Sequence, residues 1–246
     1  AAYVAGDKFA PEARHKPIYA SLAVIIALIS PLIVFDGRQG TYLAIGSAFV
    51  LLAQYVLTRR KEVYAAFLLV LSVLPYVIVS FVLPVSWSLG QVALLYAALA
   101  IPMTLVGHFV LRRRDRGSAD AQILTVVIWT IAASVAAYVF DFKEWSTPVL
   151  ALSSVSYLAI ALLDEPRYSI GGGLGVELAL LTAASAYALD TTLQIALHLV
   201  SFAAFYVLYR FSPRLTKLPL VSAVSYGGGA LIAFFIALSS DSLPMI

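Results

Sequence analysis

The chain has 246 residues, of which 62% are hydrophobic and only 12% are charged, and its formal net charge at pH 7 is +3. Soluble domains are about 45–50% apolar and about 25% charged, so a soluble core of this size would not bury so much apolar surface. The absence of cysteine excludes disulfides and thiolate-ligated metal sites within the chain. The chain also lacks a basic run interleaved with aromatic residues, the pattern that would indicate binding to nucleic acid.

Apolar stretches recur along the chain at the length of roughly 20 residues that a helix needs to cross a bilayer. We predict nine such spans with short connections. In chain order they are residues 17–35, 41–58, 63–84, 90–111, 121–141, 148–163, 172–189, 191–210 and 219–239. The sequence therefore predicts an all-α fold, a polytopic integral membrane bundle of about nine transmembrane helices, with residues 1–246 forming a single transmembrane domain and no soluble domain.

The basic residues are distributed unevenly between the two ends of these spans. The chain has 16 lysines and arginines, and nearly all of them fall before the first span or close to the connections that follow even-numbered spans. The two exceptions are Arg38 and Lys143. Because short cytoplasmic loops are enriched in Lys and Arg, we expect a cytoplasmic N-terminus and a C-terminus outside. The expected location is the plasma membrane, as a multi-pass protein. The chain has no asparagine and two methionines, a depletion that favours a thermophilic source.

Few ionisable residues fall inside the predicted spans. They are His108 in the fourth, Glu177 in the seventh and His198 in the eighth. An ionisable group within the bilayer is costly and is a functional candidate by default. With a rise of about 1.5 Å per residue, Glu177 and His108 lie roughly 8 Å and 5 Å from the cytoplasmic edge, and His198 lies roughly 17 Å from it. We therefore expect Glu177 to be held by His108 or by a group from another chain.

Two glycine clusters lie in the cytoplasmic halves of their predicted spans, near the expected depth of Glu177. The first opens the seventh span in the stretch SIGGGLGVELAL, residues 169–180, and the second follows Tyr226 in the ninth span as Gly227-Gly228-Gly229. Small residues allow close packing of membrane helices, whereas a pair of helices interrupted by glycine can mark the binding site of a transporter. Both interpretations stay open here. The candidate ligand or proton site comprises Glu177, His108, Gly173, Gly175, Tyr226 and Gly228.

Three functions remain compatible with these features. The scarcity of intramembrane polar groups and the short loops favour a non-catalytic, membrane-embedded subunit of a larger complex, such as an energy-transducing one. The alternatives are a small-solute or ion transporter, coupled to protons through Glu177, and an intramembrane enzyme acting on a lipid or quinone with Glu177, His108 and Tyr226. Of these, the subunit is the preferred hypothesis, with no catalytic activity of its own.

Cofactors and partners follow from the same residues. His108 and His198 differ in expected depth by roughly 10 Å, so they do not suit the two axial positions of one haem. No spacing of His, Asp or Glu resembles a metal-binding motif, and no metal site is predicted. We expect no cofactor within this chain, so that haem or quinone would require partner subunits. The expected partners are the lipid bilayer and other membrane subunits, and not nucleic acid.

Overall fold

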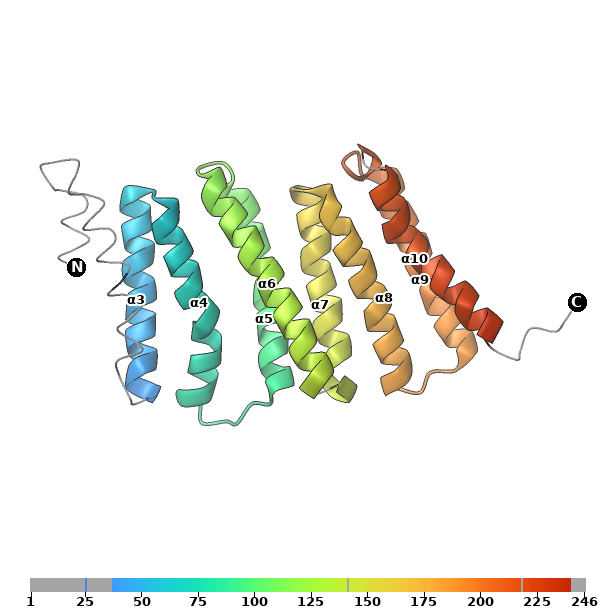
Figure 1. The fold of residues 1–246 in the computed structure, drawn as a ribbon, viewed down its shortest axis with the longest axis horizontal. Helices are drawn as coiled ribbons and strands as arrows, with labels where there is room; N and C mark the ends of the chain where they lie inside the picture. The colour runs from blue at the N-terminus through green and yellow to red at the C-terminus, as the bar shows by residue number, and fades with distance from the viewer. Residues whose placement is uncertain (1–24, 26–36, 141, 218, 240–246) are drawn as a thin grey trace, which may run out of the picture. The chain divides into compact units, whose positions relative to one another are not determined.

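The computed structural model describes residue 25 and residues 37–140, 142–217 and 219–239. For residues 142–143 and 219–226 it describes the backbone only. Every regular element within these residues is a helix (Figure 1). In chain order the elements are α3 (Gly37–Thr58), α4 (Lys61–Phe81), α5 (Leu89–Val106), the π-helical segment η2 (Gly107–Leu111), α6 (Arg116–Phe140), α7 (Phe142–Leu163), the 3₁₀ turn η3 (Pro166–Tyr168), α8 (Ser169–Ala186), α9 (Thr191–Phe211), the 3₁₀ turn η4 (Leu215–Lys217) and α10 (Pro219–Ser239).

Seven of the described helical spans are long and apolar enough to cross a membrane. They correspond to the second through eighth predicted spans. The ninth appears as α10, whose fully described part, Gly227–Ser239, is a shorter apolar helix. The first predicted span, residues 17–35, lies outside the described residues. The all-α class and the multi-pass character of the chain are thus confirmed, whereas the count of nine and the orientation of the termini stay predictions.

Several predicted boundaries differ from the observed helix ends, and two of them involve a proline or a glycine cluster. The sixth span was expected to begin at Pro148, but α7 begins at Phe142 and carries Pro148 inside it. Proline is tolerated inside membrane helices because neighbouring groups satisfy the freed carbonyl. The seventh was expected to begin at residue 172, but α8 begins at Ser169 and contains all four glycines of the first cluster. The helix is therefore continuous there, and not broken by its glycines.

Polar side chains define several helix ends. Ser88 and Gln91 form a capping box at the start of α5, and Asp190 accepts a hydrogen bond from the backbone N–H of Leu193 at the start of α9. These side chains satisfy backbone N–H groups that have no partner within the helix. Because such groups are costly to leave unpaired in an apolar environment, the caps fix where each span begins.

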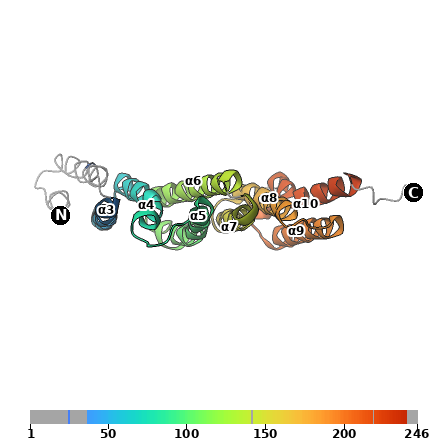
Figure 2. The same cartoon turned by 90° about the horizontal axis from the view of Figure 1, so that it is seen from below.

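The chain packs as two compact units. Unit 1 comprises residues up to Trp87 together with Phe109–Thr125, and unit 2 comprises Ser88–His108 together with the residues from Val126 onward. In unit 1, α3 and α4 form an antiparallel pair (Figure 1). In unit 2, α8 lies between α7 on one flank and α9 and α10 on the other (Figure 2).

Small residues bring the helices of unit 2 together. One core cluster joins α5, the second half of α6 and α7, and it consists of Ala93, Ala97, Ala133, Ala137 and Val149. In a bilayer, lipid is as apolar as the helix surfaces, so helices associate through close van der Waals packing, which alanine and glycine permit. Large apolar side chains instead cover the exposed faces, as expected for helices in contact with lipid.

Candidate functional site

A buried cluster of polar side chains joins α8, α9 and α10 in unit 2. The Oε2 atom of Glu177 on α8 lies 2.5 Å from Nδ1 of His198 on α9. The Oγ atom of Ser201, also on α9, donates a hydrogen bond to Oε1 of Glu177 at 2.6 Å. Glu177 is 3% exposed, His198 1% and Ser201 7%. Both carboxyl oxygens are thus engaged by side chains of one neighbouring helix, away from the outer surface.

The sequence of α9 explains how this helix presents the two groups. Its buried residues are His198, Ser201 and Phe205, which are three and four positions apart and so lie on one face of a helix. Several large apolar side chains of α9, among them Leu199, Val200 and Val207, are exposed instead. His198 and Ser201 therefore face the interior of unit 2, while these apolar side chains face outward.

Helix α10 closes the cluster through a glycine. A Cβ atom placed on Gly229 would lie 2.8 Å from Oε1 of Glu177 and 2.7 Å from the carbonyl oxygen of His198. Real Cβ atoms do not approach other atoms so closely, so only glycine fits without a shift. Gly228, the predicted candidate, is farther away, since its Cβ would lie 3.9 Å from Cγ of Glu177. Tyr226 belongs to α10, but its side chain is outside the described part of the chain.

The first glycine cluster serves mainly the packing of α8 on α7. Added Cβ atoms at Gly171, Gly172 and Gly175 would meet side chains of α7, at 3.2, 2.6 and 2.3 Å respectively. The α7 residues that they meet are Tyr157, Leu158 and Ser154. Close packing therefore accounts for these three glycines. Gly173 is also buried, on the same face of α8 as Glu177.

His108 does not pair with Glu177, contrary to our expectation. Its Nδ1 atom lies 2.8 Å from Oδ1 of Asp164, the residue that follows α7. The partner of Glu177 is His198, which we had placed roughly 9 Å too deep for such a contact. One reason is that α8 begins at Ser169, three residues earlier than predicted, which moves Glu177 about 4.5 Å farther along the helix.

The chemistry of the Glu177–His198 pair follows from its burial. An isolated ion is expensive to bury, but a carboxylate and an imidazolium in contact neutralise each other. Transfer of the shared proton from Nδ1 to Oε2 converts the ion pair into a neutral pair without changing the net charge. Addition of one further proton leaves a neutral carboxylic acid beside an imidazolium. The cluster can thus hold different numbers of protons with small movements of its side chains.

The described residues bear on one kind of ligand site, a metal site. No group of three or more His, Asp or Glu side chains suited to a metal ion occurs among the residues that the structure describes. The expectation that haem or quinone would require partner subunits stays a prediction. Comparison of the chain with protein-family models, with curated proteins and with solved structures found no match.

His198, Ser201, Gly229 and Asp164 were not among the predicted site residues, although His198 stood out as an ionisable residue within a predicted span. The spacing of His198 and Ser201 could have indicated a shared face, because positions three apart on a helix are neighbours. The sequence offers no such signal for Gly229, since the choice among three consecutive glycines depends on how α10 is rotated against α8. Asp164 lies just beyond the end of an apolar span, where charged residues are ordinary.

Proposed function

We propose that this chain is a multi-pass membrane transporter that translocates protons, with Glu177 and His198 as its proton-binding pair. The supporting observation is the contact of Oε2 and Nδ1 at 2.5 Å between two nearly fully buried side chains. We assign the protein to the plasma membrane, with the basic connections on the cytoplasmic side, from the bias of the positive charges.

Stability alone does not account for this pair. Replacing a buried ion pair with well-packed apolar residues is often neutral or stabilising, whereas a single unpaired charge is costly. In a helix surrounded by lipid the apolar solution is the cheaper one. Ionisable side chains at such positions commonly belong to proton relays and to ion or substrate pathways, and a carboxylate in contact with an imidazole is a group that can accept and release protons.

The structure gives Glu177 a partner within its own chain, His198. The preferred hypothesis from the sequence was a non-catalytic complex subunit, because intramembrane polar groups are scarce and the loops are short. A buried carboxylate in contact with an imidazole is instead the kind of group that proton transport requires. The intramembrane enzyme required Glu177 and His108 together, but His108 contacts Asp164. The transporter, an alternative at the level of sequence, is the function that this geometry supports best.

A role as a complex subunit remains the second candidate. Its support is α9, where only 11% of the most apolar stretch is buried within the chain. Such a face must be covered by lipid or by helices of other chains. Co-purification of other chains in constant ratio after mild detergent extraction would show that helices of other chains cover this face; their absence would show that lipid does. A proton-translocating chain can also belong to such an assembly.

The test of the proposed function is proton flux into liposomes that contain the purified chain, driven by a potassium diffusion potential and followed with a trapped pH-sensitive dye. We expect Glu177→Gln to reduce the flux to that of protein-free liposomes, because Gln preserves the shape and can accept the Ser201 hydrogen bond but cannot exchange a proton. Glu165→Gln is the matched control. Glu165 lies on the exposed connection and contacts Arg167 at 3.7 Å, so its loss should leave the flux unchanged. Wild-type flux through the Glu177 variant would contradict the proposal.

A further inference from the structure

A second pair of imidazole and carboxylate lies at one end of unit 2. Asp164 follows the last residue of α7, and His108 belongs to the π-helical segment η2. Their Nδ1 and Oδ1 atoms are 2.8 Å apart. The chemistry matches that of Glu177 and His198, but the exposure differs. The side chain of His108 is 21% exposed, whereas that of Asp164 is fully buried.

We propose that His108 and Asp164 form the proton-exchange site that connects bulk water with Glu177. This inference rests on the proposed function. The exposed imidazole takes a proton from a hydronium ion, which leaves water, and the buried carboxylate beside it stabilises the resulting imidazolium. The same proton then passes through Asp164 and water molecules to the Glu177–His198 pair, and His108 returns to its neutral form.

One face of α8, from its first residue to Glu177, is compatible with such a route. Ser169, Gly173 and Glu177 are spaced four residues apart and are all buried, so they follow one face of the helix. They span about 12 Å along the axis. Ser169 contributes a hydroxyl group and Gly173 contributes no side chain. We therefore assign Gly173 a role in this route, apart from the packing of Gly171, Gly172 and Gly175 on α7.

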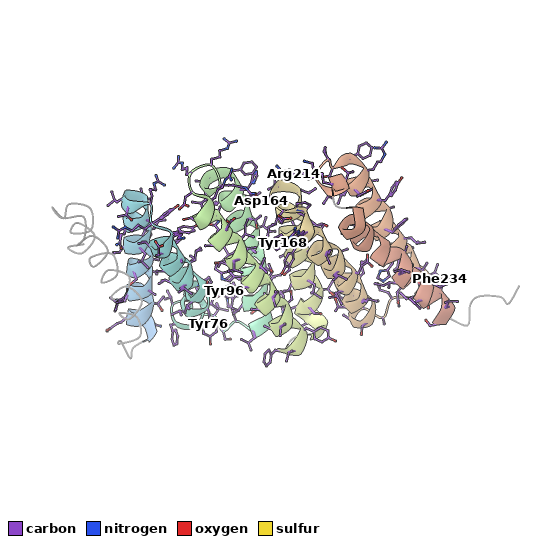
Figure 3. The ribbon with its side chains drawn as sticks, turned by 45° about the horizontal axis from the view of Figure 1, so that its top comes forward. Tyr76, Tyr96, Asp164, Tyr168, Arg214 and Phe234 are labelled. Atoms are coloured by element: carbon purple, nitrogen blue, oxygen red, sulfur yellow. The ribbon has the colours of Figure 1, made fainter. Side chains whose placement is uncertain are left out.

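Other charged groups lie close to Asp164 in the chain. Figure 3 shows Asp164, Tyr168 and Arg214 near one end of unit 2. The guanidinium of Arg214 donates a hydrogen bond to the carbonyl oxygen of Leu163, the residue before Asp164. Glu165 and Arg167 on the adjoining turn pair with each other at 3.7 Å. A π-helical segment is itself uncommon and is often found at functional sites.

The experiment compares His108→Asn with the wild-type chain in the same liposome assay. An imidazole that shuttles protons contributes on the order of 10²–10⁴ to the rate of a transfer, so we expect the flux to fall by at least about tenfold. Added free imidazole should restore most of the loss, because a diffusible base can replace the missing ring. Glu165→Gln serves again as the control.

A second variant keeps the proposal testable if His108→Asn disturbs folding. Gly173→Leu, with its folding checked by thermal unfolding in detergent, should slow the flux, whereas Gly227→Ala should not, because an added Cβ at Gly227 meets nothing within 4 Å. Unchanged flux in His108→Asn, or a loss that imidazole does not restore in a folded variant, overturns this inference. If Glu177→Gln nevertheless abolishes the flux, the proposed function survives. Wild-type flux in Glu177→Gln overturns both.

Discussion

Glu177 is held in place by contacts that leave little freedom. His198 and Ser201 engage its two oxygens, and the backbone of Gly229 lies directly beside Oε1. A carboxylate with two hydrogen-bond partners in an apolar environment is strongly positioned, since losing either partner leaves a buried polar atom unsatisfied. The chemistry of the site therefore depends on one residue without a side chain as well as on three with polar ones.

Gly229→Ala tests that dependence. The added methyl group would meet Oε1 of Glu177 and the carbonyl oxygen of His198 at under 3 Å, so α10 must move or the pair must separate. Overpacking of this kind costs about 1–3 kcal/mol. We expect a lower thermal unfolding temperature in detergent, together with reduced proton flux.

Gly227→Ala is the matched control for this substitution. The space around Gly227 is open, and alanine is favoured over glycine inside a helix by about 0.5–1 kcal/mol. The control should therefore be neutral or slightly stabilising. If both variants behaved alike, the contact between Gly229 and the Glu177 cluster would not be the cause of the effect.

At the scale of elements, Asp115 joins the start of α6 to α3 in unit 1. Its carboxylate accepts hydrogen bonds from the backbone N–H and the hydroxyl of Ser118, and a third from the hydroxyl of Tyr55. The hydrogen bond from the Ser118 hydroxyl is the largest cause that lowers the pKa of Asp115 below its ordinary value of 3.8. The residue lies in the connection before α6, outside the apolar spans.

Asp115→Ala should therefore destabilise unit 1 in a manner that depends on pH. The loss of an N-cap typically costs about 1 kcal/mol. Because the pKa of Asp115 is lower in the folded state, its charge contributes stability that is fully present above pH 3.8 and is lost as the pH falls through the folded pKa. Unfolding followed from neutral to acidic pH should show wild type and variant converging in acid. A constant difference across that range would contradict this account.

The sequence was a better guide to which helices form than to which side chains of neighbouring helices contact each other. Long apolar runs specify helices almost regardless of context, and an ionisable residue such as Glu177 stands out within them. The pairing of Glu177 with His198 depends on the rotation and tilt of α8 and α9, to which hydrophobic periodicity is a poor guide because lipid-facing surfaces are as apolar as the buried ones. The error at Pro148 has a related cause, since a proline stops a helix in water more readily than one in lipid.

At the scale of the whole molecule, the basic connections define a testable topology. We expect the turn after α9 to face the cytoplasm and the connection between α4 and α5 to face outside, from the distribution of Lys and Arg. The chain lacks cysteine, so a single introduced cysteine is the one residue in it that a maleimide can label through a thiol. Thr216 and Ser86 lie in these two connections, and both are exposed.

Thr216→Cys and Ser86→Cys are the matched pair for this test. In intact cells a membrane-impermeant maleimide should label the cysteine at position 86, and it should label the cysteine at position 216 only after the membrane is opened. The opposite pattern would show that the chain is inserted the other way, and labelling of both in intact cells would contradict the assignment of the basic connections to one side.

We predict that Glu177 exchanges protons during transport. Infrared difference spectroscopy of reconstituted vesicles, recorded while a proton gradient is imposed, measures this directly through the C=O band of a protonated carboxyl group. We predict a carboxyl band that rises and decays with the flux in the wild type and in Glu165→Gln, and that is missing in Glu177→Gln. Identical spectra from the wild type and from Glu177→Gln would contradict the account.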